Sequence, residues 1–361
     1  MSPIRVLVVD DSALMRKYLH DTLSSDPDIE VIGSAPNPNA ARDMIKRLNP
    51  DVLTLDIEMP GMNGLEFLGH VMRLRPMPVI MFSSLTQDGS KAALQALEIG
   101  AFDFVHKPCA DYEETWVSVG ATLISRIKVA AAASAGSLAP RSRQTVISPQ
   151  GAPSPWPRNR VVAIGSSAGG VQALREVLAK LPDESPPILI AQHMPAKFTR
   201  AFAGRLNGGC RVEVHEAMDG QKIKSGNVYI APGDHNLSIE KSGIALHCRL
   251  QRDVRNGPTH VPSIDRLFQS MAEVVGPAAM GIVLTGMGKD GAHGLRLIRE
   301  AGGTTAAQDE ETSLIYGMPK AAVELGAAQF EISLKRVPSF ILERHARSKK
   351  IQKSISEGVW G

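Results

Sequence analysis

The stretch Ile-Arg-Val-Leu-Val-Val-Asp-Asp, residues 4–11, is a short apolar run that ends in two carboxylates. Four further runs rich in branched apolar residues follow it, separated by helix-length segments such as Leu14–Ser25 and Lys91–Ile99. The five runs are Ile4–Asp10, Ile29–Ala35, Val52–Ile57, Val79–Ser83 and Phe102–Lys107. Strands that alternate with helices predict a doubly wound parallel sheet of the α/β class. In such a sheet, functional groups gather at the carboxyl ends of the strands.

The second half of the chain carries similar runs, which predict another α/β domain with a mainly parallel sheet of unspecified strand order. These runs are Arg160–Ile164, Ile188–Ala191, Asn227–Ala231 and Met280–Leu284. Between the halves, residues 129–158 are rich in Ala, Ser, Pro and Arg and predict a linker. We therefore expect domains at residues 1–128 and 159–348, this linker between them, and a tail at residues 349–361.

The composition is that of an ordinary globular protein. The chain has 361 residues, with 40 basic and 37 acidic side chains, and this balance does not predict a nucleic-acid or membrane-surface protein. No apolar run is expected to span a bilayer, and the amino terminus lacks a signal-peptide pattern. Cys109, Cys210 and Cys248 are far apart, so neither a disulfide framework nor a zinc site is expected. A cytoplasmic location is therefore the default expectation.

Residues suited to phosphoryl chemistry stand at the ends of the first five predicted strands. They are Asp10 and Asp11 after the first strand, Asp56 on the third, Ser83 on the fourth and Lys107 on the fifth. A parallel sheet brings them to one edge, where three carboxylates favour a divalent cation such as Mg²⁺. Asp56 can then act as a nucleophile, while Ser83 and Lys107 contact the transferred phosphoryl group. Taken singly, each residue could also be a turn former or a helix cap.

This arrangement resembles the response-regulator receiver family over about residues 4–127. The resemblance is carried by Val-Val-Asp-Asp-Ser (8–12), Leu-Asp-Ile-Glu-Met-Pro-Gly-Met-Asn-Gly (55–64) and His-Lys-Pro (106–108). It implies a flavodoxin-like fold and phosphorylation of Asp56 by a histidine kinase. It further implies a Mg²⁺ site at Asp10, Asp11 and Asp56, and a phosphate-responsive set of Ser83, Phe104 and Lys107.

A second chemical motif follows the predicted linker. The run Gly165-Ser166-Ser167-Ala168-Gly169 fits Gly-x-Ser-x-Gly between a predicted strand and a predicted helix, Val171–Leu181. Such a turn exposes its central serine, here Ser167, beside the free N–H groups of a helix start. Ser166 is a rival nucleophile one position away. A phosphate cradle is the poorer interpretation, because neither Gly-Lys-Ser/Thr nor G-x-G-x-x-G is present.

Partners for a serine nucleophile also follow predicted strands. His193 comes after the run Ile188–Ala191, and Asp290 lies in the loop after Met280–Leu284. One crevice could hold Ser167, His193 and Asp290 as nucleophile, base and orienting acid. The chain order Ser-His-Asp differs from the Ser-Asp-His order of the α/β-hydrolases. His193 could equally be a core histidine, and Asp290 an ordinary loop residue.

Residues from about 160 to 344 resemble the catalytic domain of the chemotaxis protein-glutamate methylesterases, the CheB family. The matching stretches are Ile-Gly-Ser-Ser-Ala-Gly-Gly (164–170), Gln-His-Met-Pro (192–195), Ala-Pro-Gly-Asp-His (231–235), Pro-Ser-Ile-Asp-Arg-Leu-Phe (262–268), Leu-Thr-Gly-Met-Gly-Lys-Asp-Gly-Ala (284–292) and Tyr-Gly-Met-Pro-Lys-Ala (316–321). The resemblance implies Ser167 as nucleophile, His193 as base, Asp290 as orienting acid and the Met287 N–H as an oxyanion donor. Ser166 and Ala168 depart from the Gly-Ala-Ser-Thr-Gly-Gly that family members often carry.

The two resemblances together imply an adaptation enzyme of bacterial chemotaxis. It would hydrolyse glutamate methyl esters on chemoreceptors, deamidate certain receptor glutamines, take phosphate from the chemotaxis histidine kinase, and work at receptor arrays without a cofactor in the esterase site. They also imply that the unphosphorylated receiver shields the triad. Two alternatives stay open: an esterase of a non-motility chemosensory pathway, and a docking module without catalysis. No nucleic-acid partner and no membrane insertion is expected.

Overall fold

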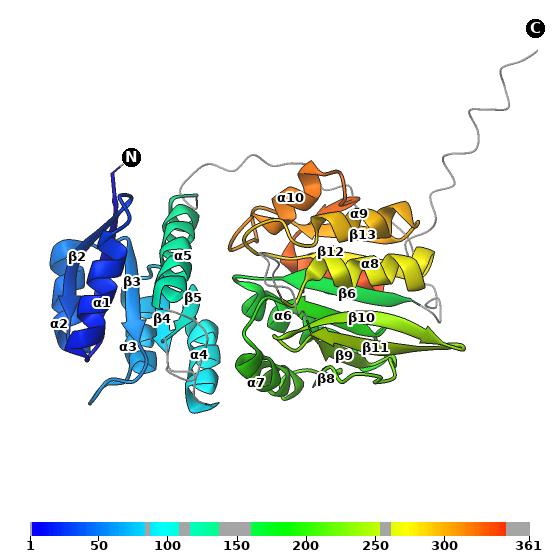
Figure 1. Cartoon of the computed structure of the whole chain (residues 1–361), viewed down its shortest axis with the longest axis horizontal. Coiled ribbons are helices and arrows are strands. Elements are labelled where there is room, and N and C mark those ends of the chain that lie inside the picture. The colour runs from blue at the N-terminus through cyan, green and yellow to red at the C-terminus, as the bar shows by residue number, and fades with distance from the viewer. Residues whose placement is uncertain (1, 84–86, 108–115, 137–159, 253–260, 344–361) are drawn as a thin grey trace, which may run out of the picture.

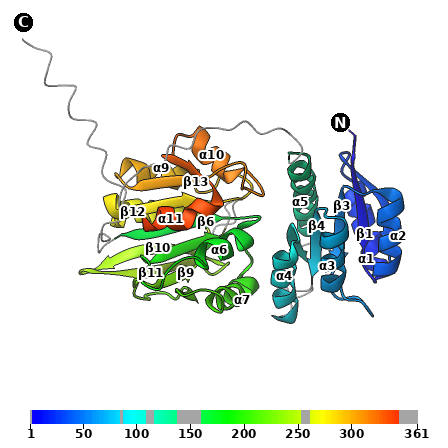
Figure 2. The same ribbon diagram turned by 180° about the vertical axis from the view of Figure 1, so that it is seen from behind.

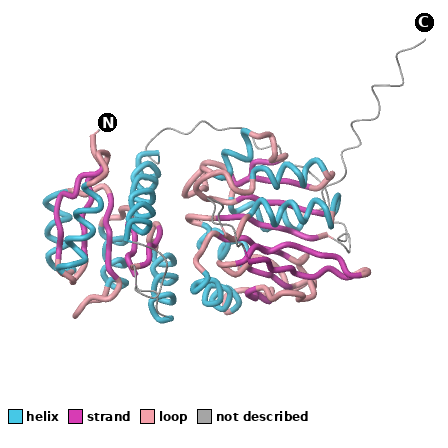
Figure 3. Tube along the Cα trace, viewed as in Figure 1, coloured by secondary structure: helices cyan, strands magenta, loops and turns pink. Residues whose placement is uncertain are grey.

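The computed structural model describes residues 2–83, 87–107, 116–136, 160–252 and 261–343, which form two α/β units (Figure 1). The amino-terminal unit, blue to cyan, lies beside the unit coloured green to red, and the view from behind shows the same arrangement (Figure 2). In both units helices flank a sheet, as the secondary-structure colouring shows (Figure 3).

The amino-terminal unit is a parallel sheet with the strand order β2-β1-β3-β4-β5. Its strands are β1 (Ile4–Val9), β2 (Ile29–Ala35), β3 (Val52–Asp56), β4 (Val79–Ser83) and β5 (Asp103–His106). Its helices are α1 (Ala13–Ser24), α2 (Pro38–Leu48), α3 (Gly64–Leu74), α4 (Gln87–Ile99) and α5 (Trp116–Gly136). The predicted doubly wound parallel sheet is confirmed, and every predicted strand matches an observed one to within a residue at each end.

Both faces of this sheet are covered by helices, because alternate side chains of β1 are apolar and point to opposite faces. Leu7 and Val9 are buried in a cluster with residues of α2, α3 and α4, whereas Val6 and Val8 are buried with residues of α1 and α5. Strands buried on both faces have continuous apolar sequences, which is the pattern of residues 6–9. Ser12 then caps α1 by accepting a hydrogen bond from the Met15 amide, so the helix begins directly behind Asp10 and Asp11.

Helix α5 corrects two of the expectations from sequence. It runs to Gly136, so residues 129–136, which were predicted to belong to the linker, are helical. The window Trp116–Ala133 is also long and apolar enough, by length and composition, to cross a membrane, contrary to the sequence-based expectation. Within that window, Val119, Leu123 and Ile127 are buried in the core of the amino-terminal unit. The rest of the predicted linker and the tail lie outside the described residues.

The second unit contains a parallel sheet with the order β14-β13-β12-β6-β7-β9-β8, so the predicted mainly parallel α/β domain is confirmed. Its strands are β6 (Val161–Ser166), β7 (Ile188–Gln192), β8 (Glu213–Glu216), β9 (Asn227–Ile230), β12 (Ala279–Val283), β13 (Thr304–Gln308) and β14 (Phe330–Ile332). Its helices are α6 (Gly170–Leu178), α7 (Ala196–Asn207), α8 (Ile264–Val274), α9 (Ala292–Glu300), α10 (Met318–Glu324) and α11 (Val337–Leu342), with 3-10 turns η1 (Gly276–Ala278) and η2 (Leu334–Arg336).

The strand order of this sheet reverses direction around β6. The chain passes from β6 to β7 and outward to β9 and β8, and later returns to the other side of β6 as β12, β13 and β14. Loops diverge at such a switch point and leave a crevice beyond the carboxyl ends of the strands. The loops after β6, β7 and β12 border this crevice. A separate antiparallel hairpin, β10 (His235–Ser242) and β11 (Ala245–Arg252), packs on α8.

Candidate active site and phosphorylation site

An acidic cluster lies at the carboxyl edge of the receiver sheet. Side-chain oxygens of Asp10, Asp11 and Asp56 lie within 4.8 Å of one another, with Asp10 and Asp56 buried and Asp11 exposed. The Lys107 Nζ is 2.8 Å from Asp56 Oδ2 and 3.1 Å from Asp10 Oδ2. A donor set made only of carboxylate oxygens suits a hard divalent cation. The structure therefore brings together the residues that were predicted to hold a metal.

Burial sets the charge state of this cluster. Burial raises the pKa of Asp56 to about 6, and the Asp10 carboxylate adds to that effect, although Lys107 opposes it. Burial likewise raises the pKa of Asp10 against the opposing charge of Lys107. For Lys107, burial acts to lower the pKa, but the two carboxylates outweigh it and raise the pKa. The ammonium therefore stays charged and holds the two acids together.

The remaining predicted receiver residues lie in two places. Ser83 is the last residue of β4, and its side chain falls outside the described part of the structure. Phe104 lies on β5, and its ring centroid is 4.5 Å from that of Phe198 on α7. The predicted switch aromatic is therefore packed against the second unit rather than only against its own core.

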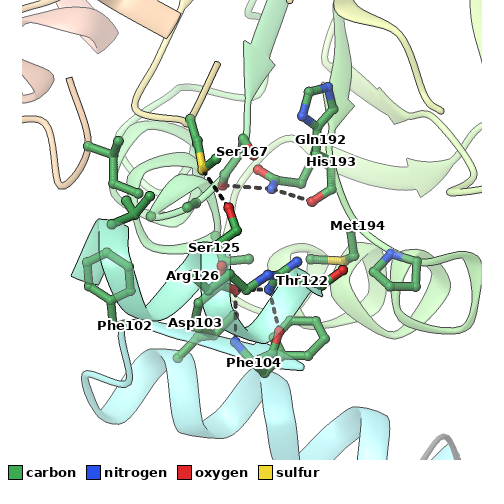
Figure 4. Close-up of a pocket in the computed structure, with 18 of the residues that line it drawn as sticks. Phe102, Asp103, Phe104, Thr122, Ser125, Arg126, Ser167, Gln192, His193 and Met194 are labelled. Carbon is green, nitrogen blue, oxygen red and sulfur yellow. Dashed lines mark hydrogen bonds and ion pairs between the residues drawn. The ribbon is translucent and has the colours of Figure 1, made fainter. Parts of the chain in front are cut away.

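The turn after β6 decides between the two candidate serines. Ser166 is fully buried, and its Oγ lies 2.6 Å from Gln192 Oε1. Ser167 is partly exposed and lines a cavity of about 700 Å³ together with His193 and Met287 (Figure 4). Gly169, at the start of α6, has φ +78°, a left-handed conformation that favours glycine and permits the sharp turn. Of the two hydroxyls, only that of Ser167 borders the cavity.

His193 and Asp290 form a hydrogen-bonded pair beside this turn. The His193 Nε2 lies 2.9 Å from Asp290 Oδ2. Asp290 also accepts hydrogen bonds from the amides of Ile264 at 2.8 Å and Asp265 at 3.0 Å, at the start of α8. Burial acts to raise the pKa of Asp290, but the bonds from His193 and the two amides outweigh it and lower the pKa. Asp290 therefore remains a carboxylate that fixes the imidazole through its Nε2.

Two helix starts hold Asp290 in place. Ser263, which caps α8, adds a third contact from its Oγ to Asp290 Oδ1 at 3.3 Å. In return, Asp265 on α8 accepts hydrogen bonds from the amides of Gly291 at 3.0 Å and Gly294 at 2.7 Å, at the start of α9. The sequence analysis missed Ser263, Asp265 and Gln192 as site residues. A serine before an apolar helix is a recognisable cap signal, but its reach to Asp290 is visible only in the fold.

Met287 borders the same cavity and contacts the receiver. Its side chain is 43% exposed, and its Sδ lies 3.8 Å from Ser125 Oγ on α5. Among the described residues, the Met287 amide N–H donates to no acceptor. An unpaired amide beside a serine is what an oxyanion donor requires. Met287, the predicted oxyanion residue, therefore lines the cavity and contacts the amino-terminal unit through Ser125.

Residues from both units enclose this cavity. The receiver contributes Phe104, Ser125 and Arg126 to its wall, opposite Ser167 and His193 (Figure 4). Farther along the interface, Glu98 of α4 forms a two-pronged ion pair with Arg205 of α7, whose Nε lies 3.0 Å from Glu98 Oε1. Arg175 of α6 approaches Glu98 at 3.9 Å. Gln172 of α6 also donates a hydrogen bond to the Leu97 carbonyl.

A receiver fold with an acidic pocket, joined to an α/β unit with a serine–histidine–aspartate crevice, defines a response regulator with an enzymatic output unit. Residues 6–114 match the family model for the response regulator receiver domain, and residues 162–341 match that for CheB methylesterase. The chain belongs to the CheB methylesterase family, as its motifs predicted.

Curated relatives match along nearly the whole chain. One from Chromohalobacter salexigens is 47% identical over 97% of this chain and 98% of its own length, and one from Escherichia coli strain K12 is 44% identical over 98% and 100%. Both are named protein-glutamate methylesterase/protein-glutamine glutaminase. A relative from Caulobacter vibrioides, named protein-glutamate methylesterase/protein-glutamine glutaminase 1, is 49% identical over 95% of this chain and 98% of its own.

Proposed function

We propose that this protein hydrolyses glutamate 5-O-methyl esters on methyl-accepting chemotaxis receptors, releasing methanol, and deamidates specific receptor glutamines. The observation that carries the proposal is one cavity lined by Ser167, His193 and Met287, with His193 hydrogen-bonded to the partly buried Asp290 carboxylate at 2.9 Å. The names of the full-length relatives support the ester and amide substrates. A docking module without catalysis would have no need of this geometry.

The proposed reaction gives each of these groups one role. Ser167 Oγ attacks the ester carbonyl carbon while His193 takes the hydroxyl proton. The Met287 N–H stabilises the negative charge on the carbonyl oxygen of the tetrahedral intermediate. His193 then gives its proton to the departing methoxide, which leaves methanol and an acyl-enzyme on Ser167. Water, deprotonated by His193, hydrolyses the acyl-enzyme and regenerates the serine. For glutamine the leaving group is ammonia.

Asp56 is the proposed phosphoacceptor, and a chemotaxis histidine kinase is the proposed donor. Asp10, Asp11 and Asp56 would hold Mg²⁺, which when bound offsets the charge of the incoming phosphoryl group. Lys107 lies 2.8 Å from the Asp56 carboxylate and is placed to pair with a phosphoryl oxygen. Ser83 is the proposed switch hydroxyl. We further propose that the enzyme acts in the cytoplasm at receptor arrays.

The receiver is proposed to shield the esterase until Asp56 is phosphorylated. In support, α5 touches Met287 through Ser125, and Phe104 stacks on Phe198 of α7. A receptor helix presenting its ester to Ser167 would meet these receiver side chains. Phosphorylation that moves β5 would weaken the contact and shift the population toward an open arrangement.

The decisive experiment incubates the full-length protein with methyl-labelled receptor membranes, with and without acetyl phosphate and Mg²⁺. Methanol release should be stimulated by the phosphodonor and abolished by Ser167→Ala. The matched control is Ser339→Ala, which removes an exposed hydroxyl bonded only locally to the Arg336 carbonyl. Activity that survives Ser167→Ala, or no methanol release at all, would refute the proposed function.

A further inference from the structure

One buried side-chain amide connects the residue proposed as nucleophile to the residue proposed as base. Gln192 is the last residue of β7, and its side chain is 2% exposed. Its Nε2 donates hydrogen bonds to the carbonyl oxygens of Ser167, at 2.9 Å, and His193, at 3.1 Å (Figure 4). Both amide hydrogens are therefore used to hold the backbone of two different catalytic segments.

Ser166 completes the arrangement from the neighbouring strand. It pairs with Gln192 in the β6–β7 register, and its Oγ lies 2.6 Å from Gln192 Oε1. The His193 amide also donates to the Ser166 carbonyl at 3.0 Å. Gly170 leaves the necessary room, because a Cβ there would lie 2.1 Å from Gln192 Oε1. The Gln192 side-chain oxygen therefore accepts a hydrogen bond from Ser166, and its nitrogen donates to the carbonyls of Ser167 and His193.

We infer that Ser166 and Gln192 are positioning residues that set the placement of Ser167 relative to His193. Neither side chain reaches the reacting atoms through any contact described above. Gln192 acts through the two backbone carbonyls, and Ser166 acts by fixing the Gln192 amide. A carboxylate in place of this amide would lack the two donors and would repel the carbonyl oxygens. The inference rests on the proposed function, since it assigns these residues to the same reaction.

The expected effect is on the chemical step rather than on substrate binding. Displacement of a catalytic group by about 1 Å costs on the order of 100-fold in rate. Gln192→Met, which keeps the volume but removes both donors, should lower kcat by about 100-fold. Ser166→Ala leaves the donors in place and frees only the amide oxygen, so kcat should fall by about tenfold. KM should stay within about twofold in both, because binding determinants are untouched.

Two readouts on the full-length protein with acetyl phosphate and Mg²⁺ test the inference. The first is steady-state methanol release from methyl-labelled receptor membranes. The second is the rate at which a small serine-directed phosphonyl fluoride labels Ser167, which does not depend on receptor docking. Both rates should fall together. The double variant should be no slower than Gln192→Met alone, because the two residues act through the same amide.

A buried hydroxyl elsewhere in the same sheet provides the matched control. Thr305, near the amino end of β13, donates to the Ala327 carbonyl at 2.7 Å, away from the crevice. Thr305→Val should lower the melting temperature but leave kcat within about twofold. Unchanged kcat in both Ser166→Ala and Gln192→Met, or effects that multiply in the double variant, would overturn the inference. Inactive wild type, or active Ser167→Ala, would instead refute the proposed function.

Discussion

Replacing Glu98 should release the esterase from its receiver without phosphorylation. Glu98 contacts Arg205 and Arg175 of the second unit, and its side chain is 26% exposed, against 35% for Arg205. A partly exposed, two-pronged pair of this kind contributes about 1 kcal/mol. Because 1.4 kcal/mol corresponds to a tenfold change in an equilibrium constant, Glu98→Gln should raise the open population about fivefold.

Reversing the charge should have a larger effect. Glu98→Arg replaces attraction with repulsion from two arginines, a change of about 2 kcal/mol. The ratio of open to closed molecules should therefore rise about thirtyfold, up to the point at which the open state predominates. The assay is methanol release by the unphosphorylated full-length protein. The basal rate should rise in the order wild type, Glu98→Gln, Glu98→Arg, and the stimulation by acetyl phosphate should shrink correspondingly. Adding Arg205→Glu to Glu98→Arg should bring the basal rate back toward that of the wild type.

The control and the refuting result are both specific. Glu300→Gln removes a surface ion pair with Arg296 within α9 and should leave the basal rate unchanged. If Glu98→Arg leaves the basal rate at the wild-type value while folding normally, the shielding model is wrong. A fragment beginning near residue 156 that is no faster than the unphosphorylated full-length protein would exclude shielding too. Activation would then come from stimulation by the phosphorylated receiver or from delivery to the receptors.

Three further predictions concern the titrating groups. In the metal-free protein, the Asp56 carboxyl should titrate near pH 6, because burial raises its pKa to about 6; a carboxyl-carbon NMR titration with a midpoint near the ordinary value of 3.8 would contradict this. In metal-free urea unfolding, Asp56→Asn should stabilise the protein at pH 8 by up to about 3 kcal/mol, and less at pH 4. The pKa of Asp56 is 3.8 in the unfolded chain and about 6 in the folded protein. Between these two pH values the folded protein keeps a proton that the unfolded chain releases, so the free energy of unfolding of the wild type falls as the pH rises from 3.8 to about 6. Asp290→Asn should lower kcat about 1,000-fold or more, since it loses the charge that stabilises and orients His193; a loss below tenfold would contradict the assignment.

The sequence could predict the local chemistry because each reactive residue ends an apolar strand or lies in the loop that follows one. A parallel sheet necessarily brings such residues to one edge, which is why Asp10, Asp56 and Lys107 meet and why Ser167 and His193 share a cavity. The motif and the family resemblance favoured Ser167 over Ser166, and the structure adds the physical difference between them. Ser166 ends β6 with its hydroxyl buried, whereas Ser167 follows the strand and lines the cavity.

Contacts between distant segments could not be predicted from one sequence. Asp265 and Asp290 each bond the start of the other's helix, yet both look like ordinary helix or loop acids when seen alone. The length of α5 was underestimated because its last residues are mostly alanine, which favours helix but resembles a low-complexity linker. The packing of Glu98 on Arg205 joins residues more than a hundred positions apart and carries no local signal.

Strand β5 offers a short physical route from phosphate to esterase. Lys107, directly after the strand, contacts the Asp56 carboxylate, whereas Phe104 within the strand stacks on Phe198. Arg126 of α5 donates to the Phe104 carbonyl and pairs with Asp103 at 2.7 Å, so α5 is fastened to the same strand. A displacement of Lys107 by a phosphoryl group would therefore be passed to both receiver elements that cover the cavity. Coupling of this kind is demonstrated only by non-additivity. Along this route, Phe104→Ala and Lys107→Met should not contribute independently to the loss of phosphorylation-dependent activation.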